Sequence, residues 1–212
     1  KVMRKIISQP SFFSRWHELI CNSASTMKKL PLVFDKLINC NGEIFHQFHT
    51  IIFDHVNIAD ENEEVFKRIG KSIQTLKISY CHLNSKQLHM IFGNMKHLKN
   101  VTLTKIQYAP CENDEEVIEC KNDEVVLKKL ELIQVDHEVL PHLLSLQAEK
   151  LEIIEANNNI NRVHLVNFVA NQKNLQSFLI DELLNNSNVL FNCDDSEKFK
   201  FKLSRFSAHF CS

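Results

Sequence analysis

An apolar triplet with the spacing LxxLxL constrains this chain more than any other feature. It occurs twice between Ser72 and Leu103, centred first on Leu76 and then on Val101, 25 residues later. Similar triplets are centred on Leu30, Ile51, Leu130, Leu151, Phe178 and Phe206. The steps between neighbouring centres run from 21 to 29 residues, a period typical of repeat proteins in which each unit adds one strand to a continuous sheet.

Two further patterns recur between the triplets. The eight positions that lie three residues beyond a triplet are Asp35, Val56, Cys81, Ile106, Val135, Ala156, Leu183 and Cys211. All of them except Asp35 are apolar or cysteine. Helical spacing follows, as in the series Leu88, Ile91, Phe92 and Met95 behind Ser85, a candidate N-cap. We therefore predict an α/β solenoid shaped like a horseshoe, with a parallel sheet on its concave side, outer helices and a short helical N-terminal cap.

The repeated unit resembles the leucine-rich repeat of the cysteine-containing type, over residues 27–212. That resemblance implies a single leucine-rich-repeat domain that binds other proteins. In such repeats the slot beyond the triplet holds an inward Asn or Cys, and we interpret Cys81 as structural for that reason.

The residues before the first triplet carry a second resemblance. The segment "FFSRWHELI" (Phe12 to Ile20) resembles the end of an F-box, commonly VCKRWxxL, through Arg15, Trp16 and Leu19. Phe13 and Ser14 depart from that pattern, and the LPxE opening of an F-box is not among the first residues. The order of segments is similar to that of F-box/leucine-rich-repeat proteins. We accordingly divide the chain into an F-box-like or capping segment at 1–26 and a repeat domain at 27–212.

This second resemblance implies a substrate-recognition subunit of an SCF-type ubiquitin ligase. Its N-terminal segment would contact a Skp-family adaptor, and through it a cullin, with residues Phe12, Phe13, Trp16 and Leu19, while the repeats hold a protein substrate. The alternative is a non-ligase scaffold for protein interactions, in which Trp16 and Leu19 belong to an amphipathic helix that covers the open end of the repeats.

Composition and motifs favour binding over catalysis. The 25 Lys and Arg nearly balance the 26 Asp and Glu, which argues against a nucleic-acid partner. Seven unpaired Cys predict a reduced compartment, cytoplasmic or nuclear, and no apolar run approaches the length of a membrane helix. Walker, GxGxxG and GxSxG motifs do not occur, and no paired metal-ligand spacing is found. We therefore expect no enzyme, cofactor or metal. Because the chain opens at Lys1, we expect a fragment or a processed form.

The candidate binding residues come from strand alternation. Residues between the apolar positions of each triplet should point to the concave face. Two neighbouring units present the same set of residues there, namely Lys129, Glu131 and Ile133 beside Lys150, Glu152 and Ile154. The two isoleucines are predicted to be exposed, either as a contact patch for a protein segment or as cross-strand packing that stabilises the sheet.

Overall fold

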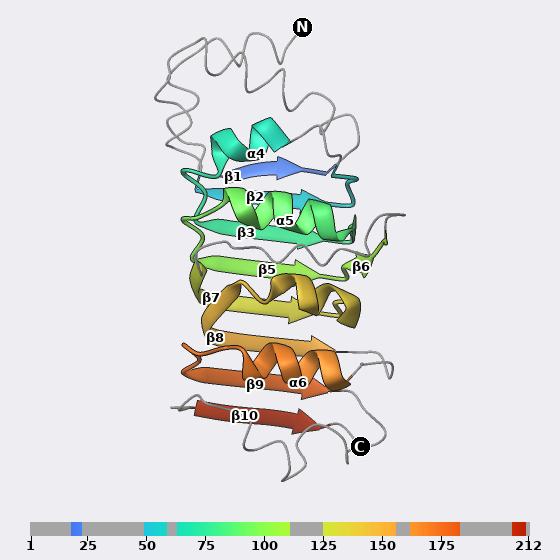
Figure 1. The fold of residues 1–212 in the computed structure, drawn as a ribbon, viewed down its shortest axis with the longest axis vertical. Helices are drawn as coiled ribbons and strands as arrows, with labels where there is room; N and C mark the ends of the chain where they lie inside the picture. The colour runs from blue at the N-terminus through green and yellow to red at the C-terminus, as the bar shows by residue number, and fades with distance from the viewer. Residues whose placement is uncertain are drawn as a thin grey trace, which may run out of the picture.

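Eight strands form one parallel sheet in this computed structural model, which describes residues 18–22, 49–58, 63–110, 125–155, 162–182 and 205–210. The strands follow one another across the sheet in chain order: β1 (Glu18–Cys21), β2 (Thr50–Asp54), β3 (Thr75–Ser79), β5 (Asn100–Thr104), β7 (Val125–Ile133), β8 (Leu146–Glu155), β9 (Ser177–Glu182) and β10 (Arg205–Phe210). Every pairing between neighbouring strands is parallel. They lie side by side along the long axis of the molecule (Figure 1).

The register of the sheet follows the triplets. Their central residues pair across it in one row: Ile51, Leu76, Val101, Leu130, Leu151, Phe178 and Phe206. Each row of side chains therefore repeats once per unit, because every strand enters the sheet at the same point of its triplet. The predicted α/β class, the parallel sheet and this alignment of the triplets are confirmed.

The first strand differs from the prediction. Leu19 pairs with Ile51, so the first described strand is β1, whereas the expected triplet around Leu30 lies outside the described residues. The F-box-like or capping segment at 1–26 was expected to be helical, and that expectation is wrong for Glu18–Cys21, which form a strand. Leu19 and Cys21 have the two-residue spacing of a strand, and pairing with β2 gives their backbone groups partners.

Helices cover one face of this sheet. The elements α4 (Glu63–Ile69), α5 (Ser85–Asn94), η3 (His137–Leu143) and α6 (Arg162–Ala170) connect consecutive strands, and all four lie on the same side in Figure 1. The core lies between the two layers, where Leu76, Phe66 and Leu88 are fully buried. Burying one such side chain contributes roughly 1.5–3 kcal/mol, so the apolar stripe of each unit holds helix to sheet.

A tight turn follows four of the strands and directs the second residue after each strand into the core. The first turn residue in each, His55, Tyr80, Lys105 or Gln134, has a positive φ between 51° and 54°. Each donates its N–H to a carbonyl at the carboxyl end of the next strand at 2.7–3.0 Å, for example Tyr80 to Thr104. The residue that follows is buried in every case, which confirms the inward slot predicted for Val56, Cys81, Ile106 and Val135. In two units a short strand comes next, and β4 (His82–Leu83) pairs with β6 (Gln107–Tyr108).

Candidate protein-interaction surface

The sheet face opposite the helices, called the open face below, consists of residues that alternate with the core. In β3, Leu76 and Ile78 are fully buried, whereas Lys77 is exposed and its neighbours Thr75 and Ser79 are partly exposed. The same alternation in β2 and β5 gives Thr50, Ile52 and Asp54 and then Asn100, Thr102 and Thr104. Because the strands are in register, these side chains form straight rows across the sheet.

The six residues predicted for binding are brought together by β7 and β8. Lys129 pairs in register with Lys150, Glu131 with Glu152, and Ile133 with Ile154. Two rows of like charges therefore lie next to each other, an arrangement that is unfavourable for directly opposite pairs. The structure relieves it with diagonal contacts.

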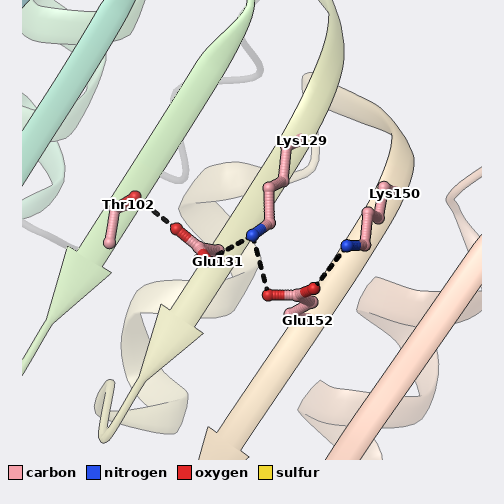
Figure 2. Close-up of polar contacts among 5 residues, drawn as sticks. All are labelled: Thr102, Lys129, Glu131, Lys150 and Glu152. Atoms are coloured by element: carbon pink, nitrogen blue, oxygen red, sulfur yellow. Dashed lines mark hydrogen bonds and ion pairs between the residues drawn. The ribbon is translucent and has the colours of Figure 1, made fainter. Parts of the chain in front are cut away.

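Four charged side chains form a connected network on the open face (Figure 2). The ammonium of Lys129 contacts Glu131 on its own strand and Oε2 of Glu152 on the next strand at 3.0 Å. Lys150 Nζ lies 2.7 Å from Oε1 of Glu152. Thr102 on β5 extends the network by donating its hydroxyl hydrogen to Glu131 Oε2 at 2.7 Å. Three neighbouring strands are thus linked through side chains as well as through backbone.

Glu152 is the centre of this network. Only 15% of its side chain is exposed, and this desolvation acts to raise the pKa of the carboxyl. Hydrogen bonds from Lys150 and Lys129 outweigh that effect and lower the pKa to about 2. Hydrogen bonding to Glu131 in turn raises the pKa of Lys129. Both partners therefore remain charged at neutral pH, and the network presents fixed charges at defined positions.

Ile133 and Ile154 lie at the carboxyl ends of β7 and β8, beside this network. Both are partly buried, so they are less exposed than predicted. Close lateral packing between strands in register explains the difference, because each isoleucine has a neighbour on the adjacent strand in the same row. They form a shallow apolar edge to the charged network.

The predicted N-terminal contact residues are only partly described. Phe12, Phe13 and Trp16 lie outside the described residues, and Leu19 is a partly buried member of β1. The structure adds Ile20, which is 52% exposed and pairs with Ile52 on the open face. The sequence reading missed it, although the alternation of Leu19 and Cys21 around Ile20 was a usable signal.

The described residues offer little that could carry out chemistry. Burial raises the pKa of the Cys21 thiol to about 12, and the pKa of Cys81 is raised by the same cause. Cys81 Sγ also donates to the carbonyl of Ser79 at 3.2 Å, which fits its structural position. Within the described ranges, no group of three or more His, Cys, Asp or Glu side chains is placed to hold a metal ion.

Comparison with known proteins identified no relative of this chain. No family model, curated protein or solved structure matches this chain. Among the described residues, no helix has both the length and the apolar character needed to cross a membrane.

Proposed function

We propose that this chain is a leucine-rich-repeat solenoid that binds a protein segment across the open face. The observation that carries the proposal is the parallel sheet itself. Its repeated units are covered by helices on one face and leave Lys, Glu, Thr and Ile side chains on the other. A broad face of this kind suits a protein surface or an extended peptide, because its rows offer many small contacts along a line.

The chemistry of the open face favours a polypeptide partner. Its charged network contains two cations and two anions close together, so it does not present the one-sign field that attracts a polyanion. Their mutual contacts hold the side chains in place before binding, which lowers the entropy lost when a partner contacts them. Ile133 and Ile154 supply apolar contact beside fixed hydrogen-bonding groups, the combination found in protein interfaces.

A more specific role is a substrate receptor for an SCF-type ubiquitin ligase. It rests on the resemblance of Arg15, Trp16 and Leu19 to an F-box end, placed ahead of the repeats. In this role the N-terminal segment binds a Skp-family adaptor that links it to a cullin, and the open face holds the substrate. The receptor catalyses nothing and acts by raising the local concentration of a substrate lysine near the conjugating enzyme.

A comparison of two double variants tests the open face as the partner surface. Ile133→Asp with Ile154→Asp places two charges on the open face, whereas Leu144→Asp with Val163→Asp places two on the helix side, where both residues are exposed. Proteins that co-purify with the wild-type chain should be lost from the first variant and kept by the second. Because the isoleucines are partly buried, circular dichroism of both variants must first show a folded chain. Retention of every partner by a folded open-face variant would rule this surface out.

The ligase role has a separate test. Affinity purification of the protein from cells should recover a Skp-family adaptor and a cullin, and Trp16→Ala should lose both while keeping open-face partners. If neither adaptor nor cullin is recovered, the ligase role is removed and the protein-binding role stands.

A further inference from the structure

A pocket of about 330 Å³ opens at the other end of the strands, where β2, β3 and β5 begin. Its walls are His49, Lys71, Ser72, Gln74, His97 and Lys99. His49, Gln74 and Lys99 each directly precede a strand, and Lys71, Ser72 and His97 come from the turns that lead into β3 and β5. The pocket therefore draws its residues from three consecutive units.

The backbone fixes the spacing of the three edge residues. The carbonyl of His49 accepts the N–H groups of Gln74 and Thr75 at 2.8 and 2.9 Å. The carbonyl of Gln74 accepts those of Lys99 and Asn100 in the same way, at 2.7 and 3.0 Å. Adjacent edge residues are thus held one strand separation apart, about 4.8 Å, so their side chains converge on a common space.

The side chains that line this pocket are cationic or neutral. Lys71 and Lys99 bring ammonium groups, and His49 and His97 bring imidazoles, while no Asp or Glu contributes to the walls among the residues the structure describes. Lys99 Nζ donates to Gln74 Oε1 at 2.8 Å, a contact that orients the ammonium without neutralising it. Ser72 donates its hydroxyl hydrogen to the carbonyl of Ile69 at 3.1 Å, which holds that turn in place.

We propose that this pocket binds the dianionic group of a phosphate monoester. The two lysine ammonium groups match the charge of that group, and the N–H donors of the lysines and imidazoles match its three terminal oxygens. In the next units the same row is occupied by Lys128 inside β7, then Glu149 inside β8, then Gln176 directly before β9. The cationic stretch therefore ends within one further unit, which favours a single compact anion over the backbone of a nucleic acid.

The first experiment is a titration of the whole chain with inorganic phosphate at constant ionic strength, followed by calorimetry and by the imidazole NMR signals of His49 and His97. We expect saturable one-site binding that shifts both imidazoles. Lys71→Gln with Lys99→Gln should weaken it by at least about tenfold, since two charge-assisted contacts are lost. Lys128→Gln removes an exposed lysine from the same row of the sheet, outside the pocket, and should change affinity less than about twofold.

Three results of this titration would overturn the proposal: no saturable binding, equal binding by the Lys71/Lys99 variant, or an equal loss in the Lys128 control, which would indicate general surface charge.

A second pair of probes identifies the source of the phosphate. Tighter binding of a phosphoserine peptide than of inorganic phosphate, with none by the unphosphorylated peptide, assigns the pocket to a phosphorylated protein segment. Equal or weaker binding of the peptide assigns it to a small phosphorylated molecule. Binding of the unphosphorylated peptide with the same affinity as its phosphorylated form would contradict a phosphate site.

Discussion

At the scale of single residues, Gly70 shows how close two helices come in this fold. A Cβ at this position would lie 2.0 Å from the carbonyl oxygen of Asn94 and 2.7 Å from that of Phe66. Gly70 directly follows α4 but does not have the positive φ typical of a helix-terminating glycine. The glycine is needed for close approach between the ends of α4 and α5, which is a long-range contact that local sequence does not reveal.

Gly70→Ala should therefore destabilise the chain. The added methyl meets backbone atoms, which cannot rotate away, so we expect a loss of about 2–3 kcal/mol in the free energy of unfolding. Urea unfolding followed by circular dichroism measures it. Gly93→Ala, inside α5, is the control and should be neutral or stabilising by about 0.5 kcal/mol because alanine favours helix. Equal effects of the two substitutions would contradict the close approach at Gly70.

The turn residues with positive φ are a second case in which a single position matters. Their side chains are not the Gly or Asn usual for this conformation, so the sequence carried no signal for them. Contacts between neighbouring turns offset the cost of this conformation for three of them. The His55 and Tyr80 rings stack with centroids 4.2 Å apart, and Lys105 Nζ lies 4.9 Å from the Tyr80 ring centroid on the next unit.

Gln134→Gly should stabilise the chain by about 0.5–1 kcal/mol, since glycine adopts positive φ without the Cβ penalty. Its backbone N–H, which bonds the carbonyl of Ile154, is kept. Tyr80→Gly should give no such gain, because it also removes the stacked ring and the cation contact. Thermal unfolding of both variants measures the difference. If Tyr80→Gly stabilised the chain and Gln134→Gly destabilised it, the proposed roles of the Tyr80 contacts and of the strain at Gln134 would both be contradicted.

At the scale of the element, helix α5 begins with a cap that the sequence placed one residue too late. Asn84, not Ser85, is the N-cap, and its side chain accepts the N–H of Gln87 at 2.8 Å. The Gln87 side chain returns the bond to the N–H of Asn84 at 3.1 Å. The Gln87 amide also donates to the carbonyl of Ile58, so this cap links α5 to the previous unit.

Asn84→Ala should lower the free energy of unfolding by about 1–2 kcal/mol, because the N–H of Gln87 in the first turn of α5 loses its side-chain acceptor. Asn84→Asp keeps the acceptor and should recover most of the loss. Chemical denaturation of the two variants measures it, and equal loss in both would mean that the cap contributes nothing.

The element η3 shows where apolar spacing in the sequence does not predict the kind of helix. Val139, Leu140, Leu143 and Leu144 have the apolar spacing of an α-helix. The structure instead has the 3₁₀ helix η3 with Pro141 inside it, and Leu144 is exposed. Proline lacks the N–H of a regular helix and crowds the preceding turn. The stacking of Tyr108 on His142, with centroids 5.2 Å apart, joins two units through residues whose proximity depends on the completed fold.

The contacts of Glu152 with Lys129 and Lys150 connect β7 to β8, and they should make the stability of the fold depend on pH. The pKa of Glu152 is about 2 in the folded chain against an ordinary value of 4.5. Its charged form therefore stabilises the fold fully above pH 4.5, and this contribution is lost as the pH falls towards 2. The stability difference between wild type and Glu152→Gln should shrink over that window. Denaturation at several pH values between 2 and 6 measures it, and a constant difference would contradict the network.

At the scale of the whole molecule, most of the sheet could be predicted because one signal repeats. The described triplet positions from Ile51 to Ile180 are buried against the helices, and a shift by one residue would expose them all. The strands from β2 to β10 accordingly pair in one register. The diagonal contact of Lys129 with Glu152 followed from that register. The strand at Glu18–Cys21 could not be predicted in this way, because the resemblance of Arg15, Trp16 and Leu19 to an F-box end favours a helix there. The partial burial of Ile133 and Ile154 depends on packing between side chains, which spacing alone does not report.

The central claim is that the open face, and not the helix side, contacts a protein partner. Site-specific photo-crosslinking in cells tests it most directly, with a photoreactive amino acid at position 154 on the open face or at position 163 on the exposed surface of α6. We predict a discrete crosslinked protein from position 154 and none from position 163. Crosslinking to a partner from position 163 with none from position 154 would contradict the claim.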